Sequence, residues 1–216
     1  MNDVVIRPLR FTDDVPAMRA FLERLGLRPR IESETGVWVE LLAGRGMVAL
    51  HDAASSSTGG RHGQTNLAFE AADIEQLRDK LESAGYDDAT VFDEAFGRVL
   101  SLTGPDGMEM WIDERSKDLY GYKRLDSPGD ERWQVTPYLT GANQQAWEVF
   151  LDLIGAEPRP LFGRPEAGWG VRLDLRTTEN LDDVLQRMST AGHAATRTDA
   201  GLEIVDPDGQ TVVVHG

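Results

Sequence analysis

Apolar and polar residues alternate along the first half of the chain with two different periods. Met18, Phe21 and Leu25 recur at the spacing of one helix face, and a glycine follows them. Short runs in which every second residue is apolar are typical of strands that bury one face. The pattern predicts helices over residues 14–25 and 73–84. It predicts strands over residues 3–10, 27–32, 36–42, 47–52, 65–71, 88–93, 97–103 and 108–113, with a Ser- and Gly-rich loop across 55–64.

These elements give the order βαβββ twice within residues 1–114. A turn of sequence Gly-Pro-Asp-Gly at residues 104–107 precedes the last strand of the second unit. Residues 115–132 are polar and rich in turn-forming residues, so they are predicted to be a linker.

The second half of the chain repeats the first in shortened form. Residues 21–30 (FLERLGLRPR) match residues 150–159 (FLDLIGAEPR), an offset of 129 residues. The offset falls to 107 for the next helix and to 102 for the two Pro-Asp-Gly turns. The first drop, of 22 residues, removes the segment that predicts a β-hairpin over residues 37–51 in the first half. Residues 133–216 are therefore predicted to be an abridged copy, βαβ followed by βαβββ.

The composition excludes several kinds of site. The chain has 216 residues, of which 40% are hydrophobic, and it contains no cysteine. Disulfides, thiolate metal sites and cysteine nucleophiles are therefore excluded. No apolar segment approaches the roughly 20 residues of a membrane helix, and no secretory signal is visible. We expect a cytoplasmic protein that does not bind a membrane.

The net charge narrows the choice of partner. A formal charge of −15 argues against nucleic acid, because nucleic-acid binding requires a positive surface. The same charge is compatible with long-range attraction of a cationic small molecule. A second interpretation is that the acidity only keeps the protein soluble.

Paired βαβββ units, a helix ending in Phe-x₄-Gly and a Pro-Asp-Gly turn before the last strand resemble the vicinal-oxygen-chelate superfamily. This superfamily includes glyoxalase I, extradiol dioxygenases, fosfomycin-resistance enzymes and bleomycin-binding resistance proteins. The resemblance covers residues 3–114 in full and residues 133–216 in part. It implies an α+β fold in which repeated units form curled mixed sheets around a ligand-binding cleft.

The resemblance also assigns the positions at which the family's metal enzymes place His, Glu or Gln. These positions fall on Ile6, Asn66 and Trp111, with a hairpin position near Ala49. Their counterparts in the second half are Val135, Leu173 and Val213. Aliphatic carbons carry no lone pair, and the indole nitrogen only donates a hydrogen bond. We therefore expect neither the family's metal site nor another cofactor.

An atypical metal site is the alternative to that expectation. His51 is predicted to point into the cleft, where Glu40, Glu109 and Asp113 could join it. Histidine and carboxylates bind metals, but these residues show no diagnostic spacing. The interpretation that we favour for His51 is a strand-end histidine that is hydrogen-bonded locally.

The predicted cleft carries aromatic side chains as well as acidic ones. Trp38 and Trp111 are predicted to face inward and, with Met47, to form a stacking surface for a flat or apolar ligand. Glu40, Glu109 and Asp113 at the rim would favour a cationic group. The opposing interpretation is that the enclosed sheet is filled by side chains, with Trp111 in the space left by the metal.

The favoured function is a metal-independent protein that binds and sequesters an aromatic or cationic small molecule, as the bleomycin-binding resistance proteins do. No nucleophile elbow, phosphate loop or dinucleotide fingerprint is present, so no catalytic residue is assigned. The candidate ligand-binding residues are Trp38, Glu40, Met47, His51, Asn66, Glu109, Trp111 and Asp113.

Two other functions stay open at this point. One is a lyase, isomerase or dioxygenase that uses the atypical metal site. The other is a protein-interaction module, because loss of the hairpin would leave sheet edges unpaired. In the bleomycin-binding proteins two identical chains form each cleft. The resemblance therefore implies either a homodimer or a fused second copy that takes the partner's place.

Overall fold

Each helix begins at a side-chain cap that the sequence supplies. The computed structural model describes residues 4–94, 97–115, 120–125 and 127–216. Its helices are α1 (Val15–Arg24), α2 (Ile74–Ser83), α3 (Gln144–Ile154) and α4 (Leu181–Thr190). The residue before each helix accepts a hydrogen bond from a backbone N–H of the first turn; these caps are Asp14, Asp73, Asn143 and Asn180. No helix within these ranges is both long enough and apolar enough to cross a membrane.

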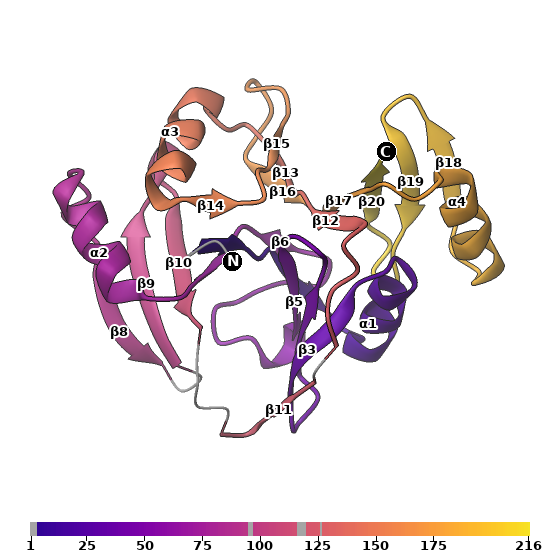
Figure 1. Cartoon of the computed structure of the whole chain (residues 1–216), viewed down its shortest axis with the longest axis horizontal. Coiled ribbons are helices and arrows are strands. Elements are labelled where there is room, and N and C mark those ends of the chain that lie inside the picture. The colour runs from indigo at the N-terminus through magenta and orange to yellow at the C-terminus, as the bar shows by residue number, and fades with distance from the viewer. Residues whose placement is uncertain (1–3, 95–96, 116–119, 126) are drawn as a thin grey trace.

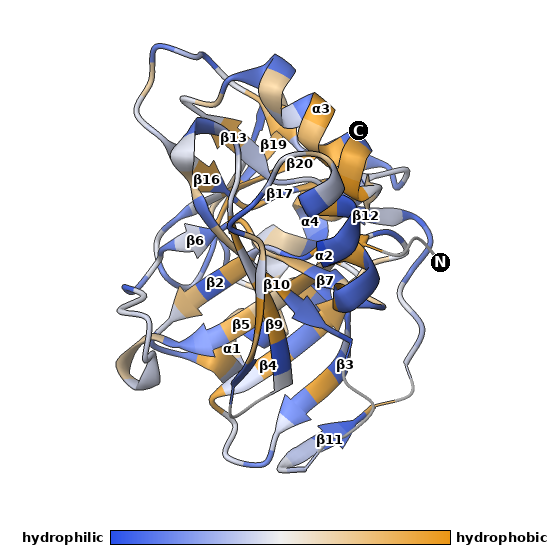
Figure 2. Ribbon diagram, turned by 90° about the vertical axis from the view of Figure 1, so that its left-hand side faces the viewer, coloured by the Kyte–Doolittle hydropathy of each residue, from blue (hydrophilic) through white to orange (hydrophobic). Residues whose placement is uncertain are grey.

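The strands of the first half form two mixed sheets. The first sheet contains, in order, β14 (Ala156–Glu157), β1 (Val4–Ile6), β7 (Phe69–Ala71), β10 (Glu109–Glu114), β9 (Gly97–Thr103) and β8 (Thr90–Glu94). The second contains β11 (Tyr122–Arg124), β3 (Arg28–Ser33), β4 (Trp38–Leu42), β5 (Met47–Asp52), β2 (Leu9–Thr12) and β6 (Thr65–Asn66). Figure 2 shows hydrophobic and hydrophilic residues alternating along these strands. The predicted α+β class with paired βαβββ units is confirmed.

The strand predicted over residues 3–10 is divided between the two sheets, a feature that its apolar pattern did not indicate. β1 pairs with β7 in the first sheet, and β2 pairs with β5 and β6 in the second. The break falls at Arg7 and Pro8, where proline has no N–H to donate to a ladder. The strand predicted over 65–71 divides in the same way into β6 and β7. Two continuous segments therefore run from one sheet into the other; residue 3 lies outside the described ranges.

The second half repeats this plan with fewer strands. Its larger sheet contains, in order, β12 (Trp133–Val135), β17 (Asp174–Thr177), β20 (Thr211–His215), β19 (Gly201–Val205) and β18 (Ala195–Thr198). Its smaller sheet contains β15 (Leu161–Phe162), β13 (Tyr138–Thr140) and β16 (Gly170–Arg172). β15 lies parallel to β13, as β5 lies parallel to β2, so it keeps the place of one hairpin strand. The prediction of an abridged second copy is confirmed.

Strand pairing joins the two halves. β14 pairs in parallel with β1, and a single bridge links Arg45 to Gln134. The segment predicted as a linker also takes part, because β11 pairs antiparallel with β3 at the edge of the second sheet. Residues 116–119 and 126 of this segment lie outside the described ranges. The sequence of the segment did not predict this strand, because it is polar. A strand at the edge of a sheet can be polar.

Both apolar cores contain residues from each half. One core lies beneath α1 and α4 and includes Phe21, Leu41 and Leu175. The other lies beneath α2 and α3 and includes Phe69 and Trp147. Figure 1 shows α2 beside α3 at one end of the molecule, with α1 and α4 at the other. Each apolar core is therefore complete only when residues of both halves are present.

A glycine at the end of α1 allows the two halves to approach closely. Gly26 has a φ of +97°, a conformation that other residues rarely adopt. A Cβ atom at this position would lie 2.5 Å from the indole nitrogen of Trp133. That nitrogen donates a hydrogen bond of 2.7 Å to Glu179, and the Trp133 side chain is fully buried. The Phe-x₄-Gly motif is therefore a packing requirement at this position as well as a helix end.

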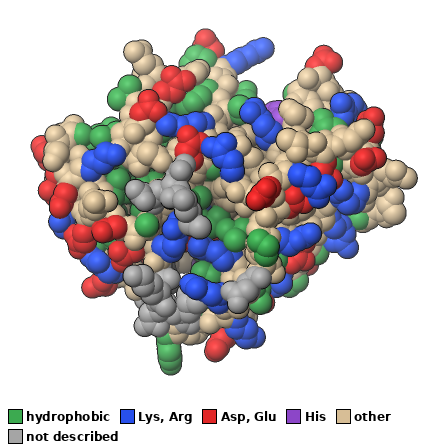
Figure 3. Space-filling view, viewed as in Figure 1, with side chains coloured by type: hydrophobic (Ala, Val, Ile, Leu, Met, Phe, Trp, Pro, Cys, Tyr) green, Lys and Arg blue, Asp and Glu red, His purple; other side chains and the backbone are tan. Residues whose placement is uncertain are grey.

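Charged side chains of both signs share the surface. Figure 3 shows Lys and Arg interspersed with Asp and Glu over the face in view. Among the described residues in view, no broad positive surface of the kind that nucleic-acid binding requires is seen.

We predict that Trp147→Ala lowers the free energy of unfolding by about 3–5 kcal/mol, the usual effect of truncating a buried tryptophan. Trp147 is fully buried, and its Nε1 donates a hydrogen bond of 2.9 Å to Asp106 of the first half. Urea unfolding followed by circular dichroism measures the change. Val149→Ala, on the exposed side of the same helix, is the matched control and should change little. Equal unfolding midpoints for the two variants would contradict a core shared between the halves.

Candidate functional site

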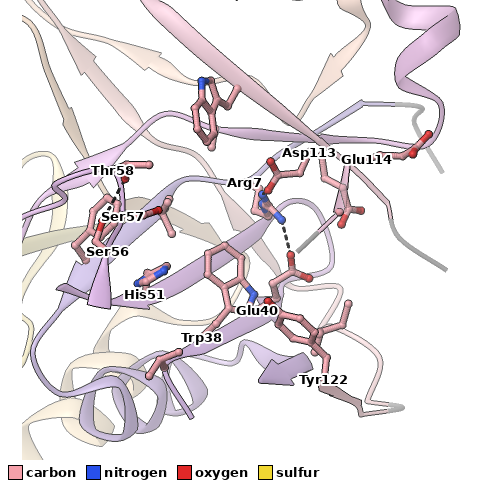
Figure 4. A pocket seen from close by; sticks show the side chains of 18 of the residues that line it. Arg7, Trp38, Glu40, His51, Ser56, Ser57, Thr58, Asp113, Glu114 and Tyr122 are labelled. Atoms are coloured by element: carbon pink, nitrogen blue, oxygen red, sulfur yellow. Dashed lines mark hydrogen bonds and ion pairs between the residues drawn. The ribbon is translucent and has the colours of Figure 1, made fainter. Parts of the chain in front are cut away.

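A cavity of about 210 Å³ lies between the first and second sheets. Side chains from both sheets line it, together with residues 56–58 of the loop after β5 and Tyr122 of β11. Figure 4 shows Trp38 between His51 on one side and the group of Arg7, Glu40 and Asp113 on the other. The site therefore combines an aromatic part with a charged part.

Five of the eight residues proposed from the sequence line this cavity: Trp38, Glu40, His51, Trp111 and Asp113. The other three do not. Met47 shares a face of β5 with His51 but is buried at the far end of that strand. Asn66 is exposed on the short edge strand β6, and Glu109 is exposed at the start of β10. Alternation therefore identified the correct faces, but it did not indicate how far the cavity extends along each strand.

The charged part of the cavity is a chain of ion pairs. Arg7 lies between Glu40, at 2.5 Å, and Asp113. Arg30 lies between Glu40, at 2.5 Å, and Glu70. Arg115 closes the chain with a contact of 2.6 Å to Glu70. Three guanidinium groups therefore neutralise three carboxylates, and we call these six residues the arginine–carboxylate network.

The protonation states of the network follow from burial and pairing. Burial by itself lowers the pKa of Arg7, but Asp113, Glu40 and Glu70 together raise that pKa above the ordinary value. Burial by itself raises the pKa of Glu70, but hydrogen bonds and charges from Arg30, with help from Arg7 and Arg115, bring it below the ordinary value. Burial raises the pKa of Tyr122, and the charges of Glu40 and Asp113 raise it further. At neutral pH Arg7 and Glu70 are therefore charged, and the Tyr122 phenol is neutral.

The position assigned to Ile6 by the family resemblance does not face the cavity. Ile6 is fully buried in the core beneath α2, whereas the next residue, Arg7, lines the cavity. Leu9 and Phe11 also line the cavity, so the cavity-facing positions of this segment alternate regularly from Arg7 and exclude Ile6. Along the segment that contains β6 and β7, Ala68 and Glu70 line the cavity, whereas Asn66 does not. The second-half positions Val135, Leu173 and Val213 are all buried.

The residues of the site that sequence reasoning missed include Arg7, Arg30, Glu70 and Tyr122. The first three carried a signal, because each is a charged residue inside or beside a short strand whose neighbours are apolar. Such residues are rarely buried unless they are paired. Tyr122 carried no comparable signal, because it lies in the polar segment that contains β11.

The residues of this site do not fit a metal ion. Glu40 and Asp113 both bind the guanidinium of Arg7, and Glu70 binds two further arginines, so these carboxylates already have cationic partners. Nδ1 of His51 is hydrogen-bonded to the backbone carbonyl of Asp52, as the favoured interpretation of this histidine expected. Across the described ranges, no group of three or more His, Asp and Glu residues is arranged to hold a metal.

The aromatic walls are held in place by neighbouring rings. The guanidinium carbon of Arg7 lies 5.5 Å from the ring centroid of Trp38, within cation–π range. The ring of Phe92 meets Trp111 edge-on, with 5.5 Å between centroids. Both indoles line the cavity and remain partly exposed. They are therefore pre-positioned for contact with a bound ring.

The loop predicted across 55–64 forms one side of the cavity and is tied to both halves. Gly60 packs against the ring of Phe11, and the backbone N–H of Gly63 donates a hydrogen bond of 2.9 Å to the Phe11 carbonyl. Arg10 donates to the carbonyl of Gly63 and also pairs with Asp206 of the second half. The loop is therefore more than the flexible connection that its glycine content predicts.

Comparison with known proteins adds fold relatives. No protein-family model and no curated protein sequence matches the chain. The Mn(II)-bound glyoxalase from Novosphingobium aromaticivorans matches 99% of this chain and 81% of its own, with 16% identity and a TM-score of 0.58. Homoprotocatechuate 2,3-dioxygenase from Arthrobacter globiformis matches 99% and 79%, with 12% identity and a TM-score of 0.60. A mutant of 4-hydroxymandelate synthase from Streptomyces coelicolor matches 97% and 90%, with 13% identity and a TM-score of 0.58.

These structural similarities confirm the fold that the repeated motifs predicted. The chain has the same fold as this glyoxalase and this 2,3-dioxygenase. At 12–16% identity they show the fold alone, so function depends on the site itself.

We predict that Glu70→Gln destabilises the protein at pH 7 by about 3 kcal/mol, because it leaves two arginines without their shared carboxylate. The pKa of Glu70 is lowered by folding, so its contribution is fully present above the ordinary value of 4.5 and is lost as the pH falls through the lowered pKa. The difference between wild type and variant should therefore shrink below about pH 4.5. Urea midpoints between pH 3 and pH 7 measure it, with Asp93→Asn on exposed β8 as the control. A difference that is independent of pH would contradict the charged network.

Proposed function

We propose that the protein binds a small aromatic compound in the cavity between its first two sheets, without a metal ion, and releases it chemically unchanged. The observation that carries the proposal is that the cavity contains two partly exposed indoles beside a network in which three arginines balance the charges of three carboxylates. Stacking surfaces are available to a ligand, whereas the carboxylates that would bind a metal are committed to arginines.

The size of the cavity supports a ligand of about one aromatic ring system. An apolar protein cavity of about 150 Å³ accommodates benzene. The cavity here, at about 210 Å³, has room for a ring with small substituents. Trp38 and Trp111 offer the offset or edge-on contacts that aromatic pairs prefer.

The charges at the cavity favour a neutral aromatic ligand over a cationic one. Glu40, Glu70 and Asp113 each contact at least one arginine, so a bound cation would compete with a guanidinium that is already in place. The last acidic residue of the lining, Glu114, lies 3.6 Å from Arg98. The negative net charge of the chain is thus not concentrated in the cavity.

The enzyme alternative predicts that a metal ion is bound in this cavity. It requires a metal held by His51, Glu40, Glu109 and Asp113, but Glu109 does not line the cavity and the two other carboxylates bind Arg7. The proposal of simple binding is therefore preferred to catalysis.

Native mass spectrometry of untagged protein, purified without chelators, separates the two functions. We expect a mass without stoichiometric metal, because three arginines already supply the cations of the site. An additional organic mass would identify a natural ligand for direct study. A stoichiometric metal that is lost in Glu40→Gln would overturn the proposal and favour the enzyme.

We predict that Trp111→Ala weakens the binding of indole by about tenfold, because an aromatic contact and the associated buried area are lost. Isothermal titration calorimetry of the purified chain measures the dissociation constant. Trp169→Ala is the control, because Trp169 stacks on Trp147 outside this cavity. Unchanged affinity in Trp111→Ala would remove Trp111 from the binding surface.

A further inference from the structure

The surroundings of His51 select one tautomer of its neutral ring. Nδ1 lies 2.7 Å from the backbone carbonyl oxygen of Asp52. A carbonyl oxygen can only accept a hydrogen bond, so Nδ1 carries the proton and donates it. The neutral ring then has its lone pair on Nε2. Among the described residues, none donates a hydrogen bond to this nitrogen.

This acceptor lies among aromatic rings. Trp38 meets the His51 ring edge-on, with centroids 5.7 Å apart, and the centroid of Phe11 lies 5.8 Å away. All three side chains line the cavity. A ring that binds there displaces water from Nε2, and an acceptor that loses water without gaining a donor is destabilising.

Three of the four carboxylates that line the cavity already accept hydrogen bonds, and the fourth, Glu114, lies 3.6 Å from Arg98. Glu40, Glu70 and Asp113 receive their hydrogen bonds from Arg7, Arg30 and Arg115. A donor on the ligand would have to break an ion pair to reach one of these carboxylates. Nε2 of His51 can accept it without breaking any contact in the described part of the chain.

We propose that the ligand is an aromatic compound with an O–H or N–H group and that this group donates its hydrogen to Nε2 of His51. The inference rests on the proposed function and narrows the ligand to phenols and N–H heteroaromatics. His51 then serves as the polar group that orients the ring between the aromatic walls. No bond is made or broken, because the contact is a hydrogen bond.

Two matched pairs of probes test this inference on the intact chain. 4-Methylphenol is compared with 4-fluorotoluene, and indole with benzofuran, by isothermal titration calorimetry. Each pair keeps the size of the ring system and removes the donor. We expect the donor-bearing member to bind about tenfold more tightly, the range of one hydrogen bond to a buried acceptor. Equal affinity within both pairs would overturn the inference, whereas binding of no probe would overturn the proposed function itself.

His51→Phe is the matched variant, because it keeps a ring against Trp38 and Phe11 and removes the acceptor. Both members of each pair should still bind it, now with equal affinity, while His51→Gln should restore part of the preference through its amide oxygen. Circular dichroism checks that each variant is folded. A preference for the donor that persists in His51→Phe would show that another group accepts the hydrogen bond and would overturn the assignment.

Discussion

The burial of Glu40 and Glu70 beside the cavity, together with the partly buried Asp113, is the constraint on which the site depends. A carboxylate removed from water costs several kcal/mol unless it is paired and hydrogen-bonded. Glu40, Glu70 and Asp113 meet this requirement through Arg7, Arg30 and Arg115. The six residues come from both sheets and from the segments beside them. The network therefore forms only when the two sheets are packed against each other.

The network also decides what chemistry the cavity can offer. On this fold a bound Mn(II) is found in a solved glyoxalase, whereas in this chain the cations near the carboxylates belong to the protein. A guanidinium holds its partners by hydrogen bonds and has no open coordination position for a substrate. In the function that we propose, recognition then depends on the indoles of Trp38 and Trp111 and on Nε2 of His51.

The abridged second half supports this site from outside it. It completes both apolar cores, through residues such as Leu175 and Trp147. It also anchors the loop at one side of the cavity, because Arg10 binds both Asp206 and the carbonyl of Gly63, and Thr12 donates to Asp208. Loss of one hairpin strand from this half is compatible with both roles, since β15 keeps the place of the other and neither role uses the missing strand.

The sequence by itself determined the helices, the repeated βαβββ order and the shortened second copy, because these follow from apolar periodicity and local turn chemistry. The arrangement of the sheets around a cleft was predicted from the resemblance of these motifs to a known superfamily. It also indicated that Trp38, Glu40, His51, Trp111 and Asp113 share the cavity-facing sides of their strands. Only the tertiary structure decided that Arg7, rather than Ile6, faces the cavity, because alternation separates the two faces of a strand but does not say which face borders a cavity. The same holds for the pairing of each carboxylate and for β11, an edge strand in a polar segment. Such contacts join residues far apart in the chain, and local sequence does not predict which charged side chains will form ion pairs.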